Sequence, residues 1–206
     1  MKIKICGLTD PSEAEYLNRN SVDIAGTVLF FPESRRNISL EMASEIHRAL
    51  DKSIKKAAVV VSPDIDEVRQ IEQAGFDYIQ IHGSIPSGYF SAVSVPVIKA
   101  FNVHDLSSYK EYSSLSGIAG YIFDAVKPGS GKTFDWSLAE KLPRDGRPVF
   151  LAGGLDSSNV ADAIDYFHPD GVDVSSGVEY NDRPGKDGHK IDLFVSAVRS
   201  MHCADL

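Results

Sequence analysis

Residues 2–13 read KIKICGLTDPSE, a short strand-like run followed within a few residues by the start of a helix. The alternation of charged and apolar residues in Lys2–Cys6 is typical of a strand. Asp10, Pro11 and Glu13 then predict a helix start, because an N-cap aspartate, a proline in the first helical position and a glutamate closing a capping box are all preferred there. A strand that passes directly into a helix is the repeating unit of α/β folds.

The same unit recurs along the whole chain. We predict strands at Lys2–Cys6, Asp23–Leu29, Ala57–Val61, Tyr78–Ile81, Val95–Lys99, Ile118–Asp124, Pro148–Ala152 and Gly171–Ser175. We expect helices over residues 12–20, 39–50, 64–74, 104–113, 157–167 and 188–201, with caps at Ser39, at Ser62 or Asp64, and at Asp156 or Ser157. Two further helices, Ser84–Ala92 and Asp135–Leu142, have little helical periodicity and are placed by count alone.

Eight strands alternating with helices in 206 residues predict an α/β fold, a closed (β/α)8 barrel in a single domain over residues 1–206. An open, doubly wound sheet uses the same alternation, and periodicity does not separate the two. No linker, low-complexity tract or charge run marks a second domain.

The composition narrows the classes of partner. A formal net charge of −8 argues against nucleic acid or an anionic membrane as the main partner, although a local pocket can still bind one phosphate. Cys6 and Cys203 form no disulfide framework, and we expect both to be free thiols in a reducing cytosol. The N-terminus lacks a signal-peptide region, and no apolar run approaches membrane-spanning length. We therefore expect a cytoplasmic protein.

Polar residues gather toward the carboxyl ends of many predicted strands, where parallel α/β folds build their sites. They are Lys4, Cys6, Gln80, His82, Lys99, Asp124, Asp173 and Ser175. Lys4 and Asp173 are expected to form a buried ion pair, and His82 to donate or accept a hydrogen bond in the pocket. No metal site is predicted, because no second His or Cys stands at ligand spacing from His82.

Two glycine-containing turns follow the last two strands, Gly153-Gly154 and Ser175-Ser176-Gly177. Loops at these two places in α/β barrels commonly bind a phosphate, because glycines let backbone N–H groups approach its oxygens. Residues 128–133, PGSGKT, look like the end of a Walker A motif, but the first glycine of that motif is replaced by Val126. A loop over the pocket is the better interpretation of this segment.

Read in order, several strings in the chain resemble the phosphoribosylanthranilate isomerases of tryptophan biosynthesis. These strings are KICGLT (4–9), PESRRNIS (32–39), QIHG (80–83), VIKA (97–100), GSGKTFDW (129–136), LAGGL (151–155) and GVDVSSGVE (171–179). The resemblance implies a TIM barrel and an Amadori rearrangement of N-(5-phosphoribosyl)anthranilate. It implies neither metal nor cofactor, since the nitrogen of the substrate supplies the electron sink.

The resemblance also implies roles for individual residues. Cys6 matches the general base and Asp124 the general acid. Arg36 matches the arginine that meets the anthranilate carboxylate, with Arg35 as its rival. The phosphate is expected at Gly153, Gly154, Ser175, Ser176 and Gly177. For catalysis we expect a cation at Lys4, Lys99 or Lys132 to lower the pKa of Cys6, and partial burial to keep Asp124 protonated part of the time.

Two departures from the family pattern concern the pocket wall at residues 26–31, GTVLFF, and a shorter loop over 125–131. Two other functions are compatible with the pattern: a related barrel isomerase or epimerase acting on another sugar phosphate, and a non-catalytic phosphate-binding barrel. Arg36 favours a substrate with a carboxylate, and the presence of both Cys6 and Asp124 argues against a pseudoenzyme. The sequence leaves the choice between monomer and homodimer open.

Overall fold

The computed structural model describes residues 1–102, 106–124 and 144–201. Within these ranges eight parallel strands form one closed barrel in the order of the chain. They are β1 (Lys2–Cys6), β2 (Ile24–Val28), β3 (Lys55–Val61), β4 (Tyr78–His82), β5 (Val97–Asn102), β6 (Ile118–Asp124), β7 (Val149–Ala152) and β8 (Gly171–Val174). Because β1 pairs with β8, with Lys4 beside Asp173, the barrel is closed and the open sheet is excluded.

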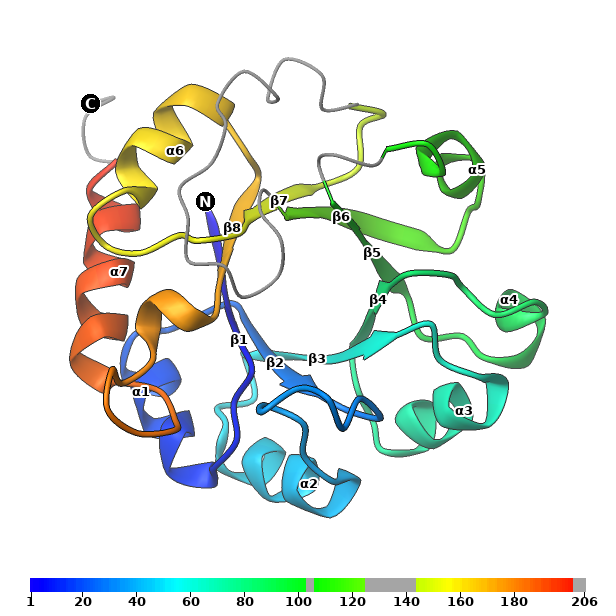
Figure 1. Cartoon of the computed structure of the whole chain (residues 1–206), viewed down its shortest axis with the longest axis horizontal. Coiled ribbons are helices and arrows are strands. Elements are labelled where there is room, and N and C mark those ends of the chain that lie inside the picture. Colours follow the sequence, from blue (N-terminus) through cyan, green and yellow to red (C-terminus); the bar gives the residue numbers. More distant parts are fainter. Residues whose placement is uncertain (103–105, 125–143, 202–206) are drawn as a thin grey trace.

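Helices surround the barrel as an outer ring (Figure 1). They are α1 (Ala14–Arg19), α2 (Leu40–Ala49), α3 (Ile65–Gln73), α4 (Tyr89–Ala92), α5 (Tyr109–Ser113), α6 (Val160–Phe167) and α7 (Gly188–Ser200), with short 3₁₀ turns η1 (Pro11–Glu13) and η3 (Ser176–Val178). The predicted helix Asp135–Leu142 lies outside the described residues.

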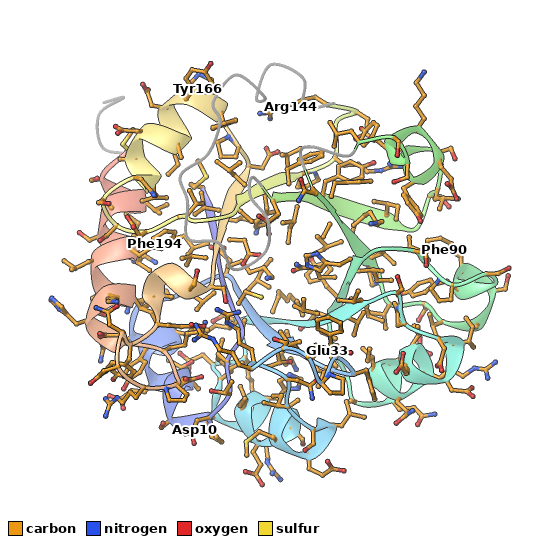
Figure 2. The ribbon with its side chains drawn as sticks, in the orientation of Figure 1. Asp10, Glu33, Phe90, Arg144, Tyr166 and Phe194 are labelled. Atoms are coloured by element: carbon orange, nitrogen blue, oxygen red, sulfur yellow. The ribbon has the colours of Figure 1, made fainter. Side chains whose placement is uncertain are left out.

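Local capping residues explain where η1, α2, α3 and α7 begin. Asp10, labelled in Figure 2, accepts a hydrogen bond from the backbone N–H of Ser12 at 2.8 Å, and Glu13 closes the predicted capping box. Asp64 rather than Ser62 caps α3, again with a capping box. Asp156 caps no helix: it folds into a tight turn that accepts from the N–H of Ser158, so α6 begins three residues later than predicted.

Among the strands, the largest difference from prediction concerns β5. The strand covers Val97–Asn102 rather than Val95–Lys99, and its pairing with β6 shifts register between Val97 and Ile98. Lys99 therefore lies inside the strand and does not end it. The weakly signalled helix Ser84–Ala92 is short, since α4 has four residues. The helix predicted over 104–113 is also shorter than expected, because α5 has five residues and begins at Tyr109.

Apolar side chains fill both faces of the barrel wall. Its interior is packed by Ile24, Ala57, Ile98, Ala100, Ile122, Phe150 and Ala152. The opposite faces of the strands pack against the helices, where Phe194 of α7 is completely buried (Figure 2). Strand alternation thus sends every second residue into the barrel, and near the carboxyl ends these inward positions become polar. Among the described helices, none is both long and apolar enough to cross a membrane.

Candidate active site

A cavity of about 410 Å³ opens at the carboxyl ends of the strands. That volume suits a small organic ligand. Eight of the nine predicted site residues line it: Cys6, Arg36, His82, Asp124, Gly153, Gly154, Ser175 and Ser176. The ninth, Gly177, does not line the cavity and packs against Leu155, which does.

Cys6 and Asp124 face the cavity from the ends of β1 and β6. In the closed barrel β7 and β8 separate these two strands, so the thiol and the carboxyl group approach the cavity from different sides. Asp124 is half-buried, whereas Cys6 is only 9% exposed. A ligand in the cavity would therefore lie between a sulfur atom and a carboxyl group.

Lys4 lies one layer below Cys6 and forms the predicted ion pair with Asp173. Its Nζ donates to the two carboxylate oxygens at 2.9 and 3.0 Å, and Lys4 is fully buried. Burial alone would lower the pKa of Lys4, but Asp173 and Cys6 outweigh it and leave that pKa raised. Lys4 is therefore a fixed positive charge beneath the thiol.

A glycine on β2 makes room for the contact between Lys4 and Cys6. A Cβ placed on Gly26 would lie 3.1 Å from the Nζ of Lys4 and 3.3 Å from the Sγ of Cys6. Any side chain at position 26 would crowd both groups. Lys4 lowers the pKa of Cys6, as predicted, and Lys186 does the same, but burial outweighs both cations and leaves that pKa raised.

Lys99, the second predicted cation, does not reach the cavity. Its Nζ donates to the carbonyl oxygens of Ala100 at 2.7 Å and Ile81 at 3.3 Å, and lies 4.6 Å from the centre of the Phe101 ring. Phe101 belongs to the layer between barrel and helices, so Lys99 points outward. Burial there lowers its pKa to about 8. The third predicted cation, Lys132, lies outside the described residues.

Lys186 is a cation near Cys6 that the sequence did not reveal. It is 1% exposed, and its Nζ donates to the backbone oxygen of Ser175 at 3.2 Å and to its hydroxyl at 3.3 Å. The Ser175 hydroxyl in turn donates to the carbonyl oxygen of Cys6 at 2.9 Å. Lys186 follows η3 in a polar loop with no strand or helix pattern, so no local signal marks it.

Arg36 and Arg35 both form ion pairs with Glu179, but only Arg36 lines the cavity. The side chain of Arg35 is 70% exposed, against 21% for Arg36. The loop that carries them is held by the side-chain oxygen of Asn37, which accepts from the N–H of Phe31 at 2.8 Å. This geometry favours Arg36 over Arg35 as the residue that meets a ligand.

Phe31 forms part of the pocket wall after β2, where residues 26–31 depart from the family pattern. It lines the cavity and packs with Cys6, Val28 and Val59, whereas Phe30 turns to the outer layer through a positive φ of 55°. An apolar ring thus stands beside the thiol. Such a wall suits an aromatic ligand.

His82 hydrogen-bonds in the pocket, as predicted. Its Nε2 lies 2.9 Å from the Nε2 of Gln80, and burial, with Lys99 and Lys4, lowers the pKa of His82 to about 4. A neutral imidazole can accept this hydrogen bond from the amide. The Oε1 of Gln80 is buried and has no hydrogen-bond partner among the described residues.

The two predicted phosphate loops pack directly on each other. Gly153 and Gly154 have φ angles of 96° and 66°, which only glycine adopts readily. A Cβ on Gly177 would lie 2.0 Å from the carbonyl oxygen of Leu155, so that position requires glycine for the loops to touch. Gly177 thus shapes the site without lining it.

Three sequence predictions fall outside the described residues. They concern the loop over residues 128–133, the shortening of the loop at residues 125–131 relative to the family, and the free thiol of Cys203. Among the residues that the structure describes, no group of three or more His, Cys, Asp or Glu side chains could hold a metal. Cys6 is a free thiol.

Comparison with known proteins agrees with this geometry. Residues 3–197 match the family described as N-(5'-phosphoribosyl)anthranilate (PRA) isomerase. The N-(5'-phosphoribosyl)anthranilate isomerase of Streptococcus gordonii is 38% identical over 203 residues, covering 96% of this chain and 97% of that protein. The enzyme of the same name from Aquifex aeolicus is 37% identical over 204 residues, covering 97% and 99%.

Solved structures show the same similarity. The phosphoribosyl anthranilate isomerase of Thermotoga maritima superposes with a TM-score of 0.84 at 32% identity, covering 97% of this chain and 99% of that one. A phosphoribosyl anthranilate isomerase in complex with reduced 1-(o-carboxyphenylamino)-1-deoxyribulose 5-phosphate gives a TM-score of 0.79 at 29% identity, with coverage of 97% and 99%.

Proposed function

The chain belongs to the N-(5'-phosphoribosyl)anthranilate isomerase family, an enzyme family of tryptophan biosynthesis, and from that membership we propose which of its residues carry out the reaction. The reaction is an Amadori rearrangement. N-(5-phosphoribosyl)anthranilate becomes 1-(2-carboxyphenylamino)-1-deoxyribulose 5-phosphate. One observation supports the proposal above all: a thiol and a carboxyl group face one cavity between an arginine and two glycine loops.

Asp124 is the proposed general acid. In its protonated form it donates a proton to the ring oxygen of the ribose, the bond from C1′ to that oxygen breaks, and the lone pair of the anthranilate nitrogen forms a Schiff base with C1′. This step needs the protonated form of the half-buried carboxyl group at the end of β6.

Cys6 is the proposed general base. As thiolate it removes the proton from C2′, and the electron pair of that bond moves toward the iminium nitrogen to give an enolamine. The enolamine then gains a proton at C1′ and loses one from the C2′ hydroxyl, which leaves the ketone. Lys4 and Lys186 stabilise the negative sulfur by their charge, although burial keeps the pKa of Cys6 raised.

The remaining contacts fit the two ends of the substrate. Arg36 is proposed to bind the anthranilate carboxylate, with Phe31 beside the aromatic ring. The backbone N–H groups around Gly153, Gly154, Ser175 and Ser176 are proposed to bind the phosphate, supported by Gly177 behind them. His82 stays neutral in the cavity and is proposed to hydrogen-bond the sugar.

We propose further that residues 1–206 act as one catalytic domain in the cytoplasm, where Cys6 stays reduced. The ends of strands from around the barrel supply the cavity, so a single chain carries the groups named above in either a monomer or a homodimer.

The test is to mix the protein with freshly made phosphoribosylanthranilate and to follow the loss of its fluorescence. The expected result is a decay that is proportional to enzyme concentration. Decay at the rate of the buffer control would contradict the assignment and leave a different sugar-phosphate isomerase or a non-catalytic phosphate-binding barrel.

A further inference from the structure

Glu179 is a buried carboxylate that the mechanism above does not use. It follows η3, is 7% exposed, and forms ion pairs with Arg35, Arg36 and Lys186. Burial alone would raise its pKa, but Arg36 and Lys186 outweigh burial and lower it to about 2. Glu179 is therefore ionised throughout the working pH range.

Two parallel hydrogen bonds join Glu179 to one edge of the Arg36 guanidinium. The Nε of Arg36 donates to Oε1 at 2.5 Å, and its Nη2 donates to Oε2 at 3.1 Å. A guanidinium carries five N–H donors in a rigid plane, so three remain after these two bonds. Those three point along the other edges of the plane, where a second carboxylate can bind.

The aliphatic part of the Arg36 side chain is also in close contact with the barrel. A Cβ placed on Gly7 would lie 2.4 Å from the Cδ of Arg36, so this stem lies directly over the residue that follows Cys6. Gly7 has a φ of 80°, which favours glycine for a second reason. Arg36 is thereby fixed beside the end of β1, next to the thiol.

Lys186 connects this arginine site to the catalytic strand. Its Nζ donates to Oε1 of Glu179 at 3.0 Å and also to Ser175, whose hydroxyl donates to the carbonyl oxygen of Cys6. Glu179 thus holds the arginine and, through Lys186, the backbone that carries the thiol in one hydrogen-bonded network.

We propose that Glu179 is the positioning residue that orients Arg36 toward the carboxylate of the substrate and so determines specificity for a carboxylate-bearing aromatic amine. This inference rests on the proposed function, in which Arg36 binds that carboxylate.

The direction in which Glu179→Gln changes substrate binding distinguishes positioning of Arg36 from simple charge compensation. The cluster of three cations and one carboxylate carries a net charge of 3 − 1 = +2, and Glu179→Gln raises it to +3. Charge alone then predicts tighter binding of an anionic substrate. Positioning predicts weaker binding, because an amide has one acceptor oxygen and breaks one of the two parallel bonds.

The experiment compares two substrates on wild type and Glu179→Gln: phosphoribosylanthranilate, and the phosphoribosylamine of aniline, which lacks the carboxylate. The expected result is a KM for the anthranilate substrate raised by about tenfold or more. The KM for the aniline substrate should change by less than about threefold, and kcat should change by the same factor with both substrates. Arg35→Gln is the matched control, because it removes an exposed partner of Glu179 and should change either KM by less than about twofold.

A lower or unchanged KM for the anthranilate substrate in Glu179→Gln would overturn the proposal. An equal rise in KM with both substrates would overturn it too. If Glu179→Gln does not fold, Glu179→Asp keeps the charge but shortens the reach, and the same selective rise in KM is expected. Wild type that turns over neither substrate would instead contradict the proposed function itself, so the two failures are distinguishable.

Discussion

The ammonium group of Lys4 lies beneath the thiol of Cys6, on the inner face of β1, and the missing side chain of Gly26 leaves the space in which they meet. Lys4 is held there by two hydrogen bonds to Asp173 across the junction of β1 and β8. The proposed general base, Cys6, thus lies above a buried ion pair that joins β1 to β8, the two strands that close the barrel.

Substitution of Gly26 by alanine should impair catalysis more than folding. The added methyl group would crowd the Nζ of Lys4 and the Sγ of Cys6 at 3.1 and 3.3 Å. We expect kcat to fall by about tenfold or more, with a stability loss of about 1–3 kcal/mol from overpacking. Steady-state kinetics and urea denaturation measure the two. Wild-type kcat in a folded Gly26→Ala variant would show that this space has no role.

The raised pKa of Cys6 predicts a thiolate fraction that increases with pH. A thiol whose pKa lies above its ordinary value stays protonated at neutral pH, and the thiolate fraction grows as pH rises through the raised pKa. In a Cys203→Ser background, where Cys6 is the remaining thiol of the chain, we expect the rate of alkylation by iodoacetamide, which reports the thiolate directly, to rise with pH through a midpoint above that of an ordinary thiol. Lys4→Gln should move that midpoint upward, since it removes a charge that lowers the pKa. A plateau already reached at neutral pH would contradict this.

Removal of Lys4 alone should be costly for stability. Lys4→Met leaves Asp173 buried without its partner, which costs about 3–5 kcal/mol. The double variant Lys4→Met/Asp173→Leu removes both charges and should recover most of that loss. Chemical denaturation of wild type and both variants measures it. A double variant as unstable as the single one would indicate packing, not charge, as the cause.

Gly177→Ala tests whether the two loops form one phosphate site. The added Cβ would clash with the carbonyl oxygen of Leu155 at 2.0 Å and push the loops apart. We expect a KM raised by about tenfold and weaker inhibition by inorganic phosphate, while the pH midpoint assigned to Cys6 stays in place. Unchanged phosphate inhibition would place the phosphate elsewhere.

Much of the fold followed from local signals. The run Lys2–Cys6 and the cap at Asp10 are both determined by neighbouring residues, and the structure has both where they were predicted. Closure of the barrel was not predictable in this way, because it depends on the pairing of β1 with β8 at the two ends of the chain.

The site was predictable where it lies on strands and in motifs, and not where it depends on contacts between loops. Lys99 was misplaced because β5 runs three residues beyond it, to Asn102, and its side chain points to the outer layer beside Phe101. Lys186 and Glu179 pair with each other in the segment after β8, and Glu179 also pairs with Arg36 from the loop after β2. Glu179 ends the family string GVDVSSGVE, but neither ion pair can be read from that string.

The most direct test of the account measures turnover of phosphoribosylanthranilate by Cys6→Ala and Asp124→Asn, each checked for wild-type circular dichroism and thermal unfolding. If these residues are the base and the acid, each folded variant should lose at least about 100-fold in kcat. A folded variant of either kind with kcat near that of wild type would contradict the account.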